Sequence, residues 1–146
     1  MMERFESSDD MNLAQVPQLL EEGKVVVLKQ VKGNSMLPFI HGEKDSVRLR
    51  KPENVEVGDI VLAVFHGRPI VHRVIAIDGT KVTLMGDGNL QGTEVGDLSE
   101  VLGVVDLIIP PSGRGRKPSK GRLWRRMLPV RKYLLKVYRK WNKVFG

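Results

Sequence analysis

Residues 69–85, PIVHRVIAIDGTKVTLM, decide the fold class. The first nine residues are rich in Val and Ile, and residues 80–85 alternate polar and apolar side chains; both patterns are typical of β-strands. Between them stands Asp78-Gly79, a dipeptide that strongly indicates a tight hairpin turn. The stretch therefore predicts two antiparallel strands joined by a short turn.

Strand-like segments of the same kind recur on both sides of this hairpin. Turn residues separate them about every 8–12 positions, which is typical of an all-β domain. The other segments that we expect to be strands are residues 24–31, 45–50, 58–65 and 100–109. We therefore predict a mostly β fold, a curled antiparallel or β-barrel-like sheet, preceded by a short N-terminal helix and followed by a basic amphipathic helix.

Composition divides the chain into four segments. Residues 1–23 predict a helical segment, and residues 24–109 hold the strands. Residues 110–121, PPSGRGRKPSKG, are Pro, Gly, Ser and basic residues, which predict a flexible linker. In residues 122–146, apolar side chains recur at steps of three and four among Lys and Arg, so this segment predicts an amphipathic helix with one basic face.

Charge is distributed very unevenly along the chain. Residues 114–146 contain 13 of the 24 Lys and Arg and no Asp or Glu, which leaves 11 basic and all 17 acidic residues, a net charge of −6, in the preceding part. The tail therefore accounts for the basic balance. Its aromatic and basic residues fit an anionic membrane surface. Docking on an acidic protein or on its own body is an alternative, and nucleic acid is less favoured because no DNA-reading motif is present.

Several classes of protein are excluded or disfavoured by composition. The chain has no cysteine, so disulfides and thiolate chemistry are excluded, and we expect no metal and no cofactor. No apolar run approaches the ~18 residues of a membrane-spanning helix. The acidic N-terminus lacks the apolar segment of a secretory signal. We therefore expect a cytoplasmic protein, either free or peripheral on the inner face of the cytoplasmic membrane.

Three short motifs in the β segment carry reactive side chains. Ser35 lies in GNSMLP, His72 in VHRVI and Asp87 in MGDGN, each at or near a strand end or turn. A serine nucleophile needs a base that takes its proton, and the base gains from an acid that orients it. The glycines that flank the serine and the aspartate permit close backbone approach. Ser35, His72 and Asp87 are thus candidates for one catalytic site.

The order of the motifs, GNSMLP, GDIV, VHRVI and GDGN, resembles the catalytic segments of signal peptidases and of the self-cleaving SOS-type repressors. The resemblance covers about residues 28–105. Most bacterial signal peptidases, and the repressors, have lysine as the base. With His72 at that position, this sequence resembles the histidine-type branch. The resemblance implies a signal-peptidase-type catalytic domain that hydrolyses an extended peptide after small side chains. Signal peptidases carry a transmembrane anchor, whereas no apolar run of this sequence predicts one.

The resemblance also implies a role for each residue. Ser35 is the expected nucleophile, its backbone N–H one oxyanion donor, and His72 the general base. Asp87 matches the Gly-Asp-x-Asn motif and is our first choice for the acid, although Asp87 could simply form the turn. Glu94 and Asp97 are the alternatives. Arg73 is expected to face the other side of the strand, where it could hold a carboxylate.

Met36 and Phe39 follow the nucleophile and are expected either to line the substrate groove or to seal the core. Two functions fit these observations. The first is a serine endopeptidase that cleaves a leader or precursor peptide at the cytoplasmic membrane face. The second is a peptidase-fold regulatory or binding module that acts through its basic tail, with weak or self-directed cleavage.

Overall fold

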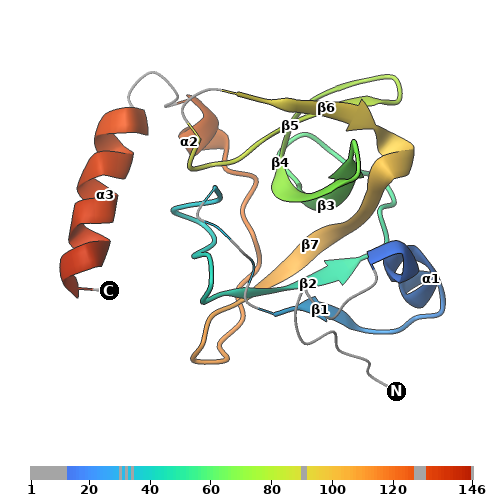
Figure 1. Ribbon diagram of the computed structural model, residues 1–146, viewed down its shortest axis with the longest axis horizontal. Helices are drawn as coiled ribbons and strands as arrows, with labels where there is room; N and C mark the ends of the chain where they lie inside the picture. Colours follow the sequence, from blue (N-terminus) through green and yellow to red (C-terminus); the bar gives the residue numbers. More distant parts are fainter. Residues whose placement is uncertain are drawn as a thin grey trace.

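The computed structural model describes residues 13–29, 31, 33, 35–89, 92–126 and 131–145. A seven-stranded antiparallel sheet has the strand order β1-β2-β7-β3-β4-β5-β6 (Figure 1). The strands are β1 (Val26–Leu28), β2 (Ser46–Arg50), β3 (Ile60–Phe65), β4 (Arg68–Asp78), β5 (Lys81–Met85), β6 (Glu94–Asp97) and β7 (Val101–Ile109). The prediction of a mostly β, curled antiparallel sheet is confirmed.

Two tight hairpins organise the centre of the sheet. In the first, β3 and β4 are joined by His66 and Gly67, both with positive φ, which matches the right-handed twist of the two strands. In the second, β4 and β5 are joined by Gly79 and Thr80, so the hairpin expected at Asp78-Gly79 is present. Strand β4 spans 11 residues and pairs with both neighbours, so its position in the sheet is well fixed.

The sheet curls far enough for its last strand to return over β3. A Cβ added to Gly96 of β6 would lie 2.4 Å from the ring of Phe65, so the ring packs directly on the glycine backbone. Register shifts between Leu62 and Ala63 and between Val74 and Ala76 add local bending. The short, glycine-containing strand β6 was not among the predicted strands, yet it closes this half-barrel.

Two groups of buried side chains make up the core. One lies between β3, β4, β5 and β7 inside the curl. The other lies between β1, β2, β7 and the N-terminal helix α1 (Val16–Glu21), which contributes Val16 and Leu20. A short 3-10 helix, Leu13–Gln15, precedes α1, and another, Leu98–Glu100, follows β6. Gly23, at φ 79°, ends the helical segment as expected, whereas residues 1–12 lie outside the described residues.

The segment after β7 is anchored on the body. Arg116 pairs with Ile108 through both backbone N–H groups, and the Lys120 ammonium contacts the carboxylate of Asp59. The expectation that residues 110–121 are a flexible linker therefore differs from the structure, because these contacts hold the segment against the sheet. Composition indicated a lack of apolar side chains, but not the backbone and ionic partners on the body.

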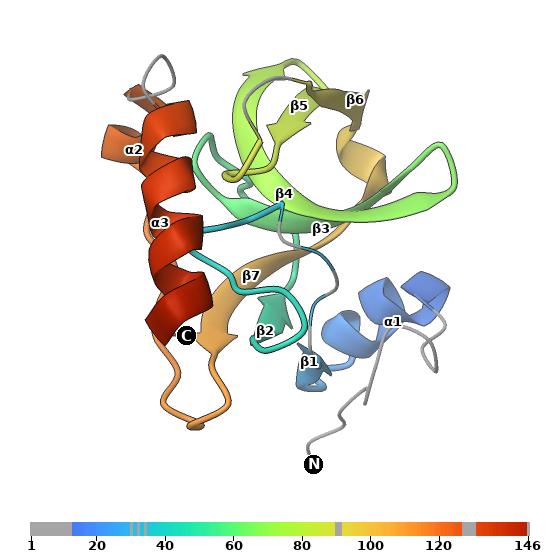
Figure 2. The same cartoon turned by 60° about the vertical axis from the view of Figure 1, so that its left-hand side comes forward.

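Two helices follow this anchored segment. They are α2 (Arg122–Arg126) and α3 (Arg131–Phe145), where one helix over residues 122–146 was expected; residues 127–130 and 146 lie outside the described residues. Figure 2 shows α3 running along one side of the body. Over the described part of the chain, no helix is both long and apolar enough to cross a bilayer.

Candidate active site

The loop that carries Ser35 is tied down on two sides. The turn at residues 41–45 bonds to the start of the loop: Glu43 donates its N–H to the Val31 carbonyl, and its carboxylate accepts from the Gly33 N–H at 3.2 Å. On the other side, the Ser35 carbonyl accepts the N–H of Gly88 at 2.7 Å. These bonds fix the backbone of Ser35 and leave its hydroxyl directed toward β4.

His72 meets this hydroxyl from the middle of β4. Its Nε2 lies 2.9 Å from Ser35 Oγ, a hydrogen-bond distance that suits proton transfer between nucleophile and base. The His72 side chain is 11% exposed, so the ring is shielded from bulk water but open toward Ser35. Neutral imidazole can accept the hydroxyl proton at Nε2 only when Nδ1 carries the hydrogen.

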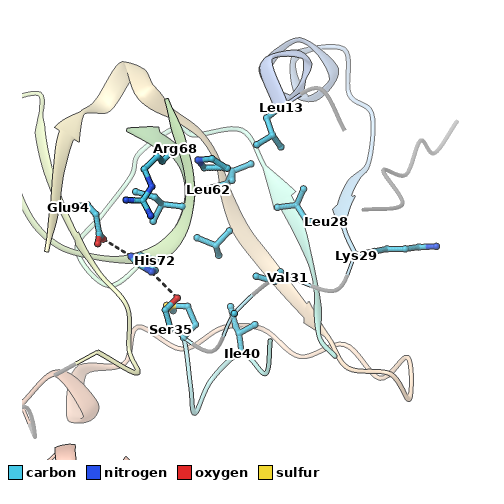
Figure 3. A pocket seen from close by; sticks show the side chains of 15 residues that line it. Leu13, Leu28, Lys29, Val31, Ser35, Ile40, Leu62, Arg68, His72 and Glu94 are labelled. Carbon is cyan, nitrogen blue, oxygen red and sulfur yellow. Dashed lines mark hydrogen bonds and ion pairs between the residues drawn. The ribbon is translucent and has the colours of Figure 1, made fainter. Parts of the chain in front are cut away.

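Glu94 selects this tautomer from the opposite side of the ring. Its Oε1 lies 2.6 Å from His72 Nδ1. An ionised carboxylate can accept a hydrogen bond but cannot donate one, so Nδ1 is the protonated nitrogen. Figure 3 shows the resulting line of Ser35, His72 and Glu94 at the edge of a cavity. The three side chains have the geometry of a nucleophile, a base and an orienting acid.

Gly86, the residue after β5, lets Ser35 and His72 approach the backbone closely. Arg73 pairs with Met85 at the end of β5, so Gly86 follows just where His72 lies. A Cβ added to Gly86 would lie 2.4 Å from the Ser35 carbonyl oxygen and 3.1 Å from His72 Nε2. Glycine is therefore required for Ser35 and His72 to approach this backbone.

Asp87, the first choice for the orienting acid, has another partner. Arg73 Nε and Nη2 donate to the two Asp87 carboxylate oxygens at 2.8 and 2.7 Å, and both side chains are almost fully buried. The contact to His72 is instead made by Glu94, one of the two alternatives. The expectation that Arg73 faces away from His72 and holds a carboxylate is confirmed. The reason is strand alternation, which sends neighbouring side chains to opposite faces.

The C-terminal segment completes the surroundings of this ion pair. Arg73 Nη1 donates to the carbonyls of Gly58 and Ser119, each at 2.7 Å. Trp124 of α2 donates its indole N–H to the Asp87 carbonyl at 2.8 Å. The buried Arg73 guanidinium needs the Asp87 carboxylate and the two carbonyl acceptors, because an unsatisfied buried charge is very costly. Residues after β7 therefore belong to the support of the site.

The other predicted site residues occupy different positions. Met36 is buried, lines the cavity at Ser35, and accepts the Asp87 N–H on its sulfur at 3.4 Å. Phe39 instead packs edge-to-face on Trp124 and lies under the Arg73 guanidinium, 5.0 Å from the ring centre. Asp97 caps the 3-10 helix after β6, where the Ser99 N–H lowers the pKa of its carboxyl. Phe39 and Asp97 thus serve the fold.

A cavity of about 490 Å³ opens beside the Ser35 hydroxyl. Its walls are mostly aliphatic, and the side chains that form them include Leu13, Leu28, Val31, Ile40, Leu62 and Val71. Figure 3 shows Leu13 and Leu28 across the cavity from Glu94, whereas the Lys29 side chain extends away from it. Such a hollow can take the apolar side chains of a peptide and keep the polar groups at its rim for the backbone.

The described residues contain no cluster of side chains that could hold a metal ion. Across residues 13–29, 35–89, 92–126 and 131–145, no three His, Asp or Glu side chains gather as potential metal ligands. The reactive groups at the cavity are the Ser35 hydroxyl, the His72 imidazole and the Glu94 carboxylate. Their arrangement can activate the hydroxyl for attack on a carbonyl carbon.

Comparison with known proteins bears on the family of the chain. No curated protein matches the chain significantly. The sequence model of the Peptidase S24-like family matches residues 2–105, which is more than half of the chain and includes Ser35, His72 and Glu94. The match and the serine-peptidase-type fold lead to one conclusion: the chain belongs to the Peptidase S24-like family, in the superfamily of signal peptidases and self-cleaving SOS-type repressors.

Proposed function

We propose that the protein is a serine endopeptidase that cleaves a leader or precursor peptide, with Ser35 as nucleophile and His72 as general base. The observation that carries this proposal is the continuous hydrogen-bonded line from Ser35 Oγ through both ring nitrogens of His72 to Glu94. A plain loop serine or a core histidine needs neither of these partners at these atoms.

The proposed reaction uses these groups in two stages. Ser35 Oγ attacks the scissile carbonyl carbon while its proton passes to His72 Nε2, and the Glu94 carboxylate stabilises the imidazolium that forms. The Ser35 backbone N–H holds the oxyanion. The proton then moves from Nε2 to the leaving amine, the C–N bond breaks, and an ester on Ser35 remains. Water, activated by the same imidazole, hydrolyses this ester.

The shape of the cavity supports an extended peptide as the substrate. The hollow lies between β3 and β4 on one side and the 3-10 helix Leu13–Gln15 and β1 on the other, so a chain in it passes alongside Ser35 Oγ. Aliphatic walls favour apolar side chains in the substrate positions next to the cleaved bond. An acidic or strongly polar segment gains little from such walls.

The test is covalent labelling of the purified protein with a peptide that carries a serine-reactive electrophile. We expect an adduct on Ser35 that is lost in Ser35→Ala and reduced by at least about 100-fold in rate in His72→Ala. Ser112→Ala removes an exposed serine in the C-terminal segment and is the matched control. Mass spectrometry of the peptides locates the adduct.

Absence of an adduct on the folded parent protein and on folded Ser112→Ala would contradict the peptidase proposal. That result would favour the second function, a peptidase-fold regulatory or binding module whose work is done by the basic tail. One observation favours this second function: residues 106–146 lie outside the region that matches the family and include all 13 basic residues of the tail.

A further inference from the structure

We propose that α3 docks on an anionic membrane surface through its outer face, defined as Leu134, Val137 and Trp141 with the flanking Lys136 and Lys140. The proposal concerns binding, so it does not depend on whether Ser35 cleaves a peptide. It commits to lipid with anionic headgroups, and the observations that lead to it are the packing, the exposure and the charge of this helix.

The inner face of α3 is already satisfied by the body. Leu135 is 2% exposed, and the Tyr138 hydroxyl bonds to the imidazole of His41. Arg139 Nη2 donates to the Gly88 carbonyl at 3.4 Å. These contacts fix the rotation of the helix about its axis, and they determine which side chains are left to face outward.

The outer face is apolar and exposed. Leu134, Val137 and Trp141 are 37%, 68% and 59% exposed. Their spacing of three and four residues puts them in one stripe along the helix. Among the described residues, only two other large apolar side chains are comparably exposed, and both lie elsewhere on the body. An exposed stripe of this kind indicates an interaction surface.

The charge around the stripe identifies the partner. Lys136 and Lys140 are exposed next to it, and residues 114–146 have 13 basic residues and no acidic ones. Anionic headgroups attract such a segment, while the apolar side chains and a tryptophan enter the boundary between headgroups and acyl chains. The phosphates of nucleic acid would satisfy the lysines alone and would leave the apolar stripe in water.

The docked helix would lie close to the reactive serine. Arg139 contacts the Gly88 carbonyl, and the Gly88 N–H donates to the Ser35 carbonyl. A membrane held by α3 is therefore connected to the nucleophile loop through a single residue. The acidic remainder of the chain, with its net charge of −6, is repelled by the same surface, which favours an orientation with α3 toward the lipid.

The experiment is co-sedimentation of the full-length Ser35→Ala protein with vesicles, one set of phosphatidylglycerol and phosphatidylcholine and one of phosphatidylcholine alone. We expect binding to the anionic vesicles and at least about tenfold weaker binding to the neutral ones. Val137→Ser with Trp141→Ser should weaken anionic binding by about tenfold or more. Lys136→Gln with Lys140→Gln should weaken it by about fivefold or more.

Matched controls change the same chemistry away from α3. Val57→Ser removes an exposed apolar side chain, and Lys51→Gln with Lys81→Gln removes two positive charges; both should bind as the parent does. Circular dichroism verifies that each variant keeps its helix. Quenching of tryptophan fluorescence by brominated lipid should occur in the parent and be lost in Trp141→Phe, which leaves Trp124 as the remaining tryptophan.

Four outcomes would overturn the proposal. The first is equal binding to neutral and anionic vesicles, and the second is binding that none of the α3 changes weakens. The third is binding without quenching by brominated lipid. The fourth is no vesicle binding; tight, salt-sensitive binding of a mixed-sequence DNA duplex would then assign the tail to nucleic acid. Since serine labelling is measured separately, failure here leaves the peptidase proposal unaffected.

Discussion

His72 and Arg73 are consecutive in β4 and serve opposite faces of the sheet. His72 contacts Ser35 and Glu94, whereas Arg73 forms a buried ion pair with Asp87. Asp87 in turn precedes Gly88, whose N–H holds the Ser35 carbonyl. The reactive pair on one face is thus supported by a charged pair on the other, and each pair predicts a different effect of mutation.

Replacing Asp87 by Asn should mainly reduce stability. The change leaves the buried Arg73 charge without its counterion, and breaking a buried pair in this way costs about 3–5 kcal/mol of unfolding free energy. Asp106→Asn is the matched control, because the Arg48–Asp106 pair is 41% and 29% exposed and should cost less than about 1 kcal/mol. Urea denaturation measures both. Equal losses would contradict the structural role of Asp87.

Replacing Glu94 by Gln should mainly reduce the reaction rate. An amide can present its NH₂ group to His72 Nδ1 and so favour the wrong tautomer, and it cannot stabilise the imidazolium. We expect the labelling rate of Ser35 to fall by at least about 100-fold, with a change in unfolding free energy of less than about 1.5 kcal/mol. Asp97→Asn is the control and should leave the rate unchanged. A normal rate in Glu94→Gln would remove Glu94 from the proposed site.

The pH dependence of labelling should follow the protonation of His72. Protonated imidazole has no lone pair for the Ser35 proton, so the rate should fall on the acid side and reach a plateau when the ring is neutral. The measurement is the rate of adduct formation across the pH range, in parallel with circular dichroism that verifies folding. A rate that continues to rise far into the alkaline range would point to a lysine base instead.

Replacing Gly86 by Ala should displace the nucleophile. The added Cβ would lie 2.4 Å from the Ser35 carbonyl oxygen, a backbone atom that can move only with the loop. We expect a destabilisation of about 1–3 kcal/mol and loss of most labelling. Gly67→Ala, in the β3–β4 turn, meets no atom near an added Cβ, but its φ of 75° strains an alanine, so it should reduce stability and leave labelling intact. Retained labelling in Gly86→Ala would show that the close approach is not needed.

The contact between α3 and the body should weaken at alkaline pH. Burial raises the pKa of the Tyr138 hydroxyl, the charge of Asp45 adds to the rise, and Arg116 opposes it. Because the pKa is higher in the folded state, the stabilisation is complete below the ordinary tyrosine pKa and is lost as pH rises through the folded value. Denaturation at neutral and alkaline pH measures this loss, which should be smaller in Tyr138→Phe. An equal loss in both proteins would contradict it.

Much of the sheet could be predicted from the sequence, because apolar runs and turn dipeptides are local signals. Strand β6 could not, because Glu94, Gly96 and Asp97 resemble loop residues, and only pairing with β5 and the approach of Phe65 make this segment a strand. The same limit applies to residues 110–121, because composition does not reveal their partners on the body, which include the Arg73 guanidinium and the Asp59 carboxylate.

Ser35 and His72 were predicted from their motifs, whereas the acid was only narrowed to three candidates. Asp87 and Glu94 are equivalent in charge, and the choice between them depends on which face each strand presents. Arg73 takes Asp87, and Glu94 is then the acid that reaches His72. Strand alternation from His72 predicts the face on which Arg73 lies, but not which carboxylate forms an ion pair with it.

The contacts of Ser119 and Trp124 imply an order of events during synthesis. A chain emerges from the ribosome with its N-terminus first, so all seven strands are available before residues 119–124 leave the exit tunnel. Until then, Arg73 lacks the Ser119 carbonyl and the Asp87 carbonyl lacks the Trp124 indole. The sheet of a growing chain therefore gains these two contacts only after residues 119–124 have left the ribosome.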